Sequence, residues 1–147
     1  MIVGFTGTSQ GMTDIQKVRL ERILFELFHA DQSSSTEFHH GDCVGADEEA
    51  DEIAESIGYT RVIHPPINPY KRAHCQTKII WEPKEYLVRN HDIVNCSNIM
   101  IACPKEAHEV LRSGTWATIR FANKFPEKDK YLITPSGTVF RFHRKKS

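Results

Sequence analysis

Three glycine-bearing turns are the segments of this sequence whose residue types and spacing suit binding chemistry. They are Gly7–Gly11, Gly41–Asp47 and Ser113–Thr115, and each is predicted to fall just after a strand and just before a helix. Glycine lets a backbone approach a ligand closely, while the free N–H groups and positive end of the following helix attract a phosphate. The same segments and their edges add hydroxyl donors, which are Thr6, Thr8, Ser9, Ser113 and Thr115.

The spacing of the first turn excludes two common nucleotide-binding motifs. A P-loop needs a glycine followed by Lys and Ser or Thr, and a dinucleotide fingerprint needs GxGxxG; Gly7–Gly11 fits neither. A single glycine turn often has only a structural role. Three turns predicted at one edge of a sheet favour a phosphate-binding site over that reading.

Four further polar residues admit two interpretations. Asp42 and Asp47 lie on either side of the second turn, where they either cap the helix and satisfy loop N–H groups or contact a ribose hydroxyl or base. Arg89 and Asn90 are either surface residues of a helix or ligands of the phosphate, which a guanidinium binds through bidentate hydrogen bonds.

The eight histidines and four cysteines do not predict a metal site. His39 and His40 are neighbours on a predicted strand, so they point to opposite faces and are poorly placed to chelate one ion. No HExxH or paired Cys/His spacing is present, and we expect no metal and no resident cofactor. We expect free thiols at all four cysteines, with Cys96 and Cys103 buried as small apolar residues.

The elements that position these residues are predicted from apolar runs, period and turn residues. The predicted strands cover residues 2–6, 37–40, 61–64, 98–103 and 131–134, and 137–142 adds an edge strand or hairpin. The predicted helices run from the Thr13 cap to about Ala30, from Ala46 to a stop at Gly58, from near Pro83, and from about Gly114 to Asn123.

This alternation predicts the fold class. Strands alternating with helices indicate an α/β fold, a single Rossmann-like domain over residues 1–147, with a mainly parallel sheet and helices on both faces. The nearly unbroken apolar run 98–103 is typical of a strand buried on both sides. The long stretch between Pro65 and Trp81 is predicted to be a surface excursion at the ligand-binding edge of the sheet.

Composition limits the class of partner. The chain has 147 residues, 39% of them hydrophobic, with 19 basic and 19 acidic side chains. The balanced charge therefore disfavours nucleic acid as a partner, and the basic run Arg141–Lys146 is interpreted as a solvated tail after an edge strand within 136–147. No segment predicts a signal peptide or membrane span, so we expect a cytoplasmic protein, with a homo-oligomer as one option.

At these same residues the sequence resembles the SLOG superfamily, which includes LOG-like and DprA-like proteins, and specifically its branch related to YspA and circularly permuted YpsA. The resemblance extends from residue 2 to about residue 134 in matching order. It is carried by Gly4–Thr8, His40–Asp47, His64–Pro65, Tyr86–Asn90, Ile101–Pro104 and Arg112–Ala122.

The resemblance implies a Rossmann-like fold that binds a nucleotide or nucleotide-derived small molecule. The pocket residues that it implies, together with the hydroxyl donors Ser9 and Ser113, are Gly7, Thr8, Gly41, Asp42, Gly45, Asp47, Arg89, Asn90, Gly114 and Thr115. Superfamily members include ligand sensors, DNA-processing proteins and enzymes that cleave the N-glycosidic bond of nucleoside monophosphates. Fold resemblance alone does not choose among these functions.

One departure from the enzymatic LOG pattern bears on that choice. LOG-like phosphoribohydrolases carry a PGGxGTxxE stretch, and the corresponding run here, Arg112–Thr118, lacks the glutamate. We therefore favour a sensor or sequestering protein over a nucleoside monophosphate N-glycosidase. In the second hypothesis, Asp42 or Asp47 is the catalytic carboxylate that stabilises the transition state. A third hypothesis, single-stranded DNA binding through Trp116, Phe121 and the tail, is disfavoured by the neutral charge.

Overall fold

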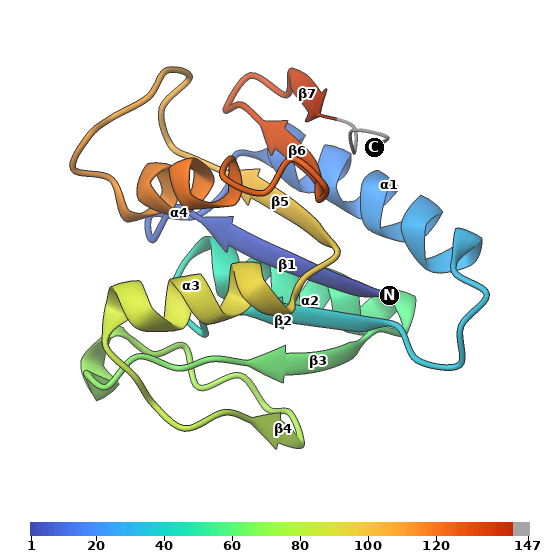
Figure 1. Cartoon of the computed structure of the whole chain (residues 1–147), viewed down its shortest axis with the longest axis horizontal. Helices are drawn as coiled ribbons and strands as arrows, with labels where there is room; N and C mark the ends of the chain where they lie inside the picture. The colour runs from blue at the N-terminus through green and yellow to red at the C-terminus, as the bar shows by residue number, and fades with distance from the viewer. Residues whose placement is uncertain (143–147) are drawn as a thin grey trace.

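The structure, a computed structural model, follows the predicted alternation of strands and helices and describes residues 1–142 (Figure 1). The strands are β1 (Ile2–Gly7), β2 (Glu37–His40), β3 (Thr60–Ile63), β4 (Ile79–Ile80), β5 (Ile99–Cys103), β6 (Asp129–Ile133) and β7 (Val139–Phe142). The helices are α1 (Asp14–Ala30), α2 (Ala46–Ile57), the 3-10 turn η1 (Pro69–Lys71), α3 (Tyr86–Cys96) and α4 (Gly114–Ala122).

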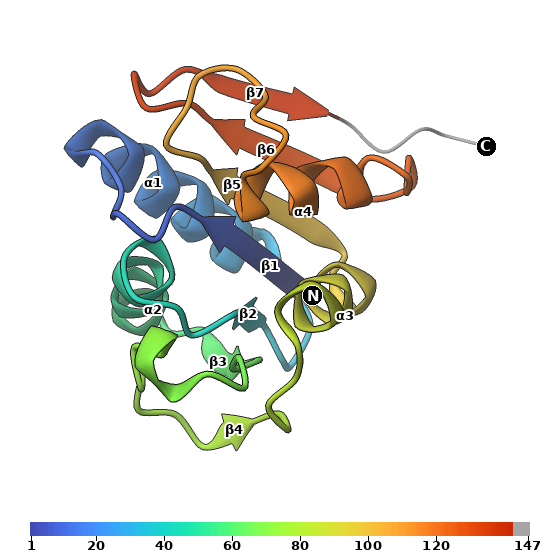
Figure 2. The ribbon, with the colours of Figure 1, turned by 90° about the vertical axis from the view of Figure 1, so that its left-hand side faces the viewer.

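All seven strands form one sheet in the order β4-β3-β2-β1-β5-β6-β7. Every pair is parallel except β6 and β7, which form an antiparallel hairpin, one of the two arrangements expected for residues 137–142. Helices α1 and α2 cover one face and α3 and α4 the other (Figure 2). The predicted Rossmann-like α/β fold with a mainly parallel sheet is therefore confirmed.

The strand order fixes where a ligand can bind. β1 pairs with β2 on one side and with β5 on the other, so the chain winds in opposite directions from the two central strands. In open α/β sheets a crevice forms outside the carboxyl ends of the strands at such a switch point. The turns after β1 and β5 meet at this edge.

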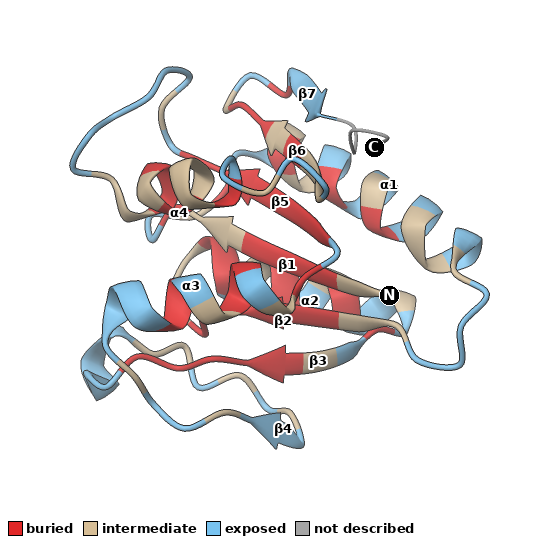
Figure 3. Ribbon diagram, viewed as in Figure 1, coloured by how far each residue is buried: buried red, intermediate tan, exposed pale blue. Residues whose placement is uncertain are grey.

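The core lies along the central strands (Figure 3). All five residues of β5 are buried, as the apolar run predicted for a strand covered on both faces. Phe5, Phe38 and Ile101 are almost completely inaccessible to solvent and pack in the layer between the sheet and helices α1 and α2. A rigid central sheet therefore supports the turns at its carboxyl edge.

Local signals in the sequence correctly predicted where two helices begin or end. Thr13 caps α1 and forms a capping box with Gln16, whose N–H donates to Thr13 Oγ1 at 3.2 Å. Gly58 follows α2 at φ 120°, a conformation that favours glycine. The buried Gln16 side chain also donates to the carbonyl oxygens of Pro104 and Ile133, both at 2.9 Å, which fastens α1 to the carboxyl edge of the sheet.

Four details differ from the prediction. The excursion after β3 contains the two-residue strand β4, and α3 begins at Tyr86 rather than near Pro83. Residues 104–113 separate β5 from α4, so the third glycine turn does not follow its strand directly. Cys103 is buried as expected, but Cys96 is only partly buried because it ends α3 at the rim of the layer.

All four cysteines are free thiols. Of the terminal basic run, the structure describes Arg141 and Phe142, which belong to β7; the rest of the predicted tail lies outside the described residues. Within residues 1–142 no helix is long and apolar enough to cross a membrane.

Candidate functional site

A cleft of about 580 Å³ opens at the carboxyl ends of β1 and β5. It lies at the switch point of the sheet, between the loop after β1, the loop after β5 and the amino end of α4. Its volume is within the range of sites for small molecules. The lining residues are Gly7, Thr8, Ser9, Gln10, Cys43, Val44, Tyr70, Lys71, Tyr86, Lys105, Glu106, Val110, Arg112, Ser113, Gly114 and Thr115.

The first and third glycine turns meet in this cleft. The predicted site residues that line it are Gly7, Thr8, Ser9, Ser113, Gly114 and Thr115. The second turn contributes Cys43 and Val44 instead of its glycines and carboxylates. The predicted residues that are not among the lining are Gly41, Asp42, Gly45, Asp47, Arg89 and Asn90.

The loop after β1 is held by its own backbone. The Thr8 N–H donates to the Cys103 carbonyl at 3.1 Å, and the Gly11 N–H donates to the Thr8 carbonyl at 3.2 Å. The Thr8 hydroxyl accepts the Gln10 N–H at 3.2 Å. These bonds fix the floor of the cleft to the end of β5 and leave the Ser9 side chain exposed.

The amino end of α2 packs against this loop. The Ala46 N–H donates to the Thr8 carbonyl at 2.9 Å. Gly45 has φ 91°, and a Cβ on it would overlap the Ser9 carbonyl and lie 2.8 Å from the Thr8 oxygen. Gly45 therefore allows two backbones to touch, and the Ala46 N–H is occupied by protein.

The amino end of α4 opens onto the cleft. The Ser113 hydroxyl caps α4 by accepting the Trp116 N–H at 3.2 Å. The first N–H groups of a helix have no partner within it, and Gly114 and Thr115 occupy these positions. The Tyr86 side chain lies where a Cβ on Gly114 would be, so glycine lets α3 and α4 approach each other here.

Asp42 joins the second turn to the excursion after β3. Its buried carboxylate accepts the Cys75 N–H at 2.9 Å and pairs with Arg72 Nε at 3.0 Å. Its carbonyl accepts the Ala73 N–H at 2.8 Å. Asp42 itself has φ 54°, an uncommon conformation outside glycine. The two loops form one wall of the cleft as a result.

Asp47 and Arg89 stabilise the same turn through hydrogen bonds on its buried side. Asp47 Oδ2 accepts the Cys43 N–H at 3.2 Å, and burial raises the pKa of this carboxyl despite the nearby Arg89. The Arg89 guanidinium donates to the carbonyls of Gly41 and His64 and, at 3.1 Å, to Cys43 Sγ. Arg89 is 2% exposed, so its charge acts beneath the cleft.

Beside this network, two buried polar atoms have no hydrogen-bond partner among the described residues. They are Arg89 Nε and Asn90 Nδ2, and buried groups of this kind are usually paired. The Arg89 guanidinium carbon lies 4.7 Å from the centre of the Tyr86 ring, which faces the cleft. Arg89 thus supports both the turn and an aromatic wall residue.

Seven lining residues that were not predicted as site residues give the cleft its charge and its aromatic or apolar surface. Three are basic, one is acidic and three offer apolar or aromatic surface; they are Lys71, Lys105, Arg112, Glu106, Tyr70, Tyr86 and Val110. For all but Tyr86 the signals available were indirect, because the excursion after β3 and the loop after β5 were expected at this edge but have no motif. Their positions depend on how these loops fold back.

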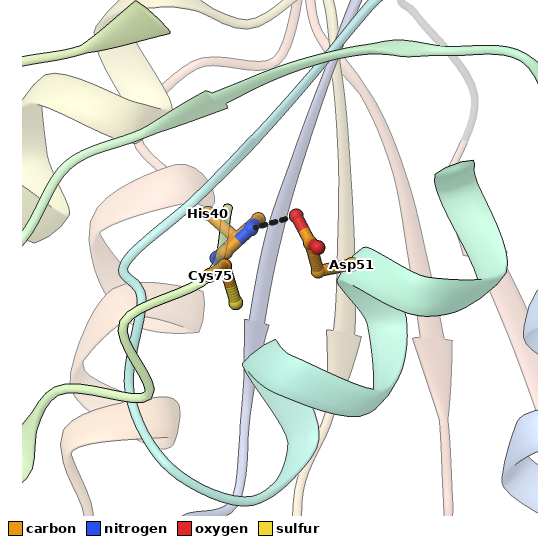
Figure 4. Close-up of side chains that lie close together, drawn as sticks. All are labelled: His40, Asp51 and Cys75. Atoms are coloured by element: carbon orange, nitrogen blue, oxygen red, sulfur yellow. Dashed lines mark hydrogen bonds and ion pairs between the residues drawn. The ribbon is translucent and has the colours of Figure 1, made fainter. Parts of the chain in front are cut away.

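A second cluster lies on the α2 side of the sheet, where His40, Asp51 and Cys75 bring ligand-type atoms within 4.8 Å of one another (Figure 4). His40 Nδ1 accepts the Asp42 N–H at 3.0 Å, which leaves the proton on Nε2 for the 2.8 Å bond to Asp51. Metal-bound histidines usually donate through their second nitrogen, the reverse of this arrangement.

The other members of that cluster are also engaged. Asp51 pairs with Arg61 at 2.6 Å; burial opposes ionisation, but the bonds from His40 and Arg61 keep the pKa of Asp51 below its usual value. Burial and nearby carboxylates raise the pKa of the Cys75 thiol. This geometry fits a buried hydrogen-bonded cluster better than a metal centre.

His39 and His40 point to opposite faces, as predicted. The His39 ring shares a 2.8 Å hydrogen bond with His64 of the segment after β3 and contacts Glu37 at 2.7 Å. His64 packs against the Trp81 ring with centroids 4.2 Å apart, and its Nδ1 has no partner among the described residues. Burial lowers the pKa of His64 to about 3.

Comparison with known proteins finds similarity at the level of the fold. No family model matches the chain, and no curated protein matches it. The molybdenum cofactor binding protein of the phototrophic bacterium Rippkaea orientalis aligns with a TM-score of 0.67 and 21% identity, over 90% of this chain and 76% of that one. The molybdenum cofactor carrier protein of Chlamydomonas reinhardtii aligns with a TM-score of 0.64 and 18% identity, over 90% and 77%.

A third solved structure is TM1055, with a TM-score of 0.54, 15% identity and coverage of 85% and 69%. All three alignments extend over most of the α/β domain. They support the Rossmann-like architecture derived from the strand order. Two of the three aligned proteins, those of Rippkaea orientalis and Chlamydomonas reinhardtii, bind or carry a small molecule, the molybdenum cofactor.

Proposed function

We propose that this chain is a binding protein for a nucleotide or nucleotide-derived small molecule and holds its phosphate in the cleft at the switch point. The observation that carries the proposal is the convergence of the Thr8–Gln10 loop and the amino end of α4 on one cleft. The loop offers the Thr8 and Ser9 hydroxyls, because its Thr8 and Gln10 N–H groups already have protein acceptors. The amino end of α4 offers N–H groups without a partner in the helix, and a helix amino end favours an anion. The protein then acts as a sensor or sequestering protein, in line with the resemblance to the SLOG branch.

The charge of the lining supports an anionic ligand. Lys71, Lys105 and Arg112 line the cleft with Glu106 as the acidic side chain among the lining residues, although the whole chain has equal numbers of basic and acidic groups. A local positive excess concentrates phosphate-bearing ligands at the site. Arg112 lies two residues before Gly114, the first residue of α4, and its guanidinium is suited to bidentate contact with a phosphate.

A second candidate ligand is the molybdenum cofactor, carried as cargo. The observation that favours it is the similarity, over 90% of this chain, to a molybdenum cofactor binding protein and a molybdenum cofactor carrier protein. The cleft residue Cys43 adds a sulfur atom to the lining. At 18–21% identity this similarity informs the choice of ligands to test.

The alternative of an N-glycosidase requires a carboxylate at the sugar. Asp42 and Asp47 were the candidates, and each is buried and hydrogen-bonded to loop backbone outside the lining of the cleft. This placement supports binding over hydrolysis. Glu106 is the carboxylate that lines the cleft, so Glu106→Gln is the variant to compare if free base is released from a nucleoside monophosphate.

Thermal unfolding of the purified chain tests the proposal. The panel is nucleoside monophosphates, cyclic dinucleotides, ADP-ribose and the molybdenum cofactor, each at several concentrations. A ligand at 100 times its Kd stabilises the folded state by about 2.7 kcal/mol. We expect at least one member to raise the Tm, and Arg112→Ser to reduce that rise.

The matched control is Arg22→Ser, which removes an exposed arginine of α1 outside the cleft. It is expected to leave the ligand-induced rise unchanged. A panel in which no phosphate-bearing ligand raises the Tm would overturn the proposal. A homo-oligomer and a cytoplasmic location are also part of this proposal. Size-exclusion chromatography of the same samples tests the homo-oligomer.

A further inference from the structure

The exposure of Tyr70 distinguishes it from the other aromatic side chains of the site. Tyr70 lines the cleft, yet its side chain is 94% exposed, whereas Tyr86 on the same cleft is 42% exposed. Tyrosine rings offer a large apolar surface and are usually covered. An almost bare ring at the mouth of a binding cleft is therefore available to cover part of a bound molecule.

The backbone that carries this ring is anchored on both sides. The Asn68 side chain accepts the Tyr70 N–H at 3.0 Å, and Pro69 begins the turn. On the other side, the Lys71 carbonyl accepts the Val44 N–H at 3.3 Å, and Arg72 pairs with Asp42. Hydrogen bonds and an ion pair hold the main chain on both sides of Tyr70 in place, although its ring is not packed. The backbone therefore fixes where the exposed ring lies.

Two of the three basic lining residues and the amino end of α4 lie on the other side of the cleft, whereas the third, Lys71, is adjacent to Tyr70 in η1. Lys105 and Arg112 come from residues 104–113, which approach the tip of β1 from the side opposite to η1 (Figures 1 and 2). The amino end of α4 is continuous with that segment. A molecule bound with its phosphate there extends toward Tyr70 across a cleft of about 580 Å³.

We infer that Tyr70 determines specificity by stacking on a planar heterocycle, so that the ligand class is a phosphorylated heterocycle rather than a sugar phosphate. The inference rests on the proposed phosphate site and adds a contact between Tyr70 and the heterocycle of the ligand. Stacking on an aromatic side chain tolerates different rings because each presents a π-face. A nucleobase and a pterin share this chemistry, and the test separates them.

The experiment measures affinity by isothermal titration calorimetry for three probes: adenosine monophosphate, a pterin monophosphate and ribose 5-phosphate. The first two carry a ring and the third carries the phosphate without one. The wild-type chain is expected to bind at least one ring-bearing probe about tenfold or more tightly than ribose 5-phosphate. Tyr70→Ala is expected to remove most of that ratio, and Tyr70→Phe to retain it.

Phe25→Ala is the matched control, because Phe25 is an exposed aromatic residue of α1 outside the cleft. It is expected to leave the ratio unchanged. If a ring-bearing probe binds and the ratio is the same in Tyr70→Ala, the stacking inference is wrong while the phosphate site stands. If none of the probes binds the wild-type chain, both the phosphate site and the stacking inference are overturned for these ligand classes.

Discussion

Some residues of this protein both stabilise the fold and influence the shape of the cleft, and Gly45 is the clearest case. Gly45 and Gly11 both have a positive φ, of 91° and 92°, and Gly45 combines it with a ψ of −126°. A Cβ on Gly11 would be 3.4 Å from the Glu49 carboxylate, whereas one on Gly45 would overlap fixed backbone at Ser9. A side chain has a conformational cost at both positions, and at Gly45 it also overlaps fixed backbone.

Replacing each glycine by alanine separates these costs. Gly11→Ala is expected to lower the free energy of unfolding by about 1 kcal/mol through the left-handed backbone alone. Gly45→Ala is expected to lower it by about 3 kcal/mol, because the β1 loop and α2 must also move apart. Urea titration of both variants provides the comparison. Equal losses of unfolding free energy in the two variants would show that α2 and the loop can move apart without destabilising the protein.

The buried His64 predicts how stability depends on pH. Burial lowers its folded-state pKa to about 3, while an unfolded histidine titrates near 6.5. Between these values the unfolded chain binds the proton and the folded chain does not, so stability is complete above about pH 6.5 and falls as the pH decreases toward 3. The slope from one such group reaches about 1.4 kcal/mol per pH unit.

His64→Gln is therefore expected to flatten the decline in unfolding free energy between pH 6.5 and pH 4. A residual slope remains, because burial also lowers the pKa of His39. The exposed His108 gives the control, and His108→Gln should retain the wild-type slope. A His64→Gln profile parallel to wild type would mean that this histidine does not resist protonation in the folded state.

At the scale of elements, the cleft depends on a loop-to-loop clamp. Asp42 attaches the 71–75 segment to the second turn through its carboxylate and carbonyl. Asp42→Ala leaves the Arg72 charge and the Cys75 N–H without their partner. Breaking a buried ion pair costs about 3–5 kcal/mol, and the partial exposure of Arg72 places the expected loss at about 2–4 kcal/mol.

Hydrogen exchange locates the effect of that variant. The amides of residues 71–75 are expected to exchange faster in Asp42→Ala, while those of β5 on the far side of β1 keep their protection. Glu52→Ala, which removes an exposed carboxylate of α2, should leave both regions and the stability within about 0.5 kcal/mol of wild type. Unchanged exchange at 71–75 would contradict the clamp.

The sequence predicted these elements unevenly, for physical reasons. The Thr13 capping box, the Gly58 stop and the apolar run of β5 depend on near neighbours in the chain, and all three were predicted correctly. Strand β4 has two residues, and its pairing to β3 depends on how the excursion folds back. No local period marks it.

The residues of the candidate site were also predicted unevenly. The turns containing Thr8 and Gly114 were predicted to meet because parallel strands bring their carboxyl ends to one edge. The partners of Asp42 and Arg89 come from loops far away in the sequence, and so their burial beneath the cleft was not predictable. Tyr70 and Lys71 were missed because nothing in a polar, proline-containing excursion distinguishes residues that fold back onto the sheet.

For the whole molecule, charge is balanced overall and uneven locally. With 19 basic and 19 acidic side chains, the chain has no net field to attract a distant anion. Attraction of a phosphate must then come from the few basic groups of the cleft, Lys71, Lys105 and Arg112, which are all exposed. Interactions of exposed charges weaken as salt shortens the Debye length from about 10 Å at 0.1 M to about 3 Å at 1 M.

The affinity for a phosphate-bearing ligand is accordingly expected to fall about tenfold between 0.1 M and 1 M potassium chloride, as measured by calorimetry. Arg112→Ser should bind more weakly at 0.1 M and lose less affinity on addition of salt, because one of the screened charges is already absent. Arg22→Ser, outside the cleft, should retain the wild-type slope. A wild-type affinity that does not change with salt would mean that hydrogen bonds from the buried turns, rather than the basic rim, hold the anion.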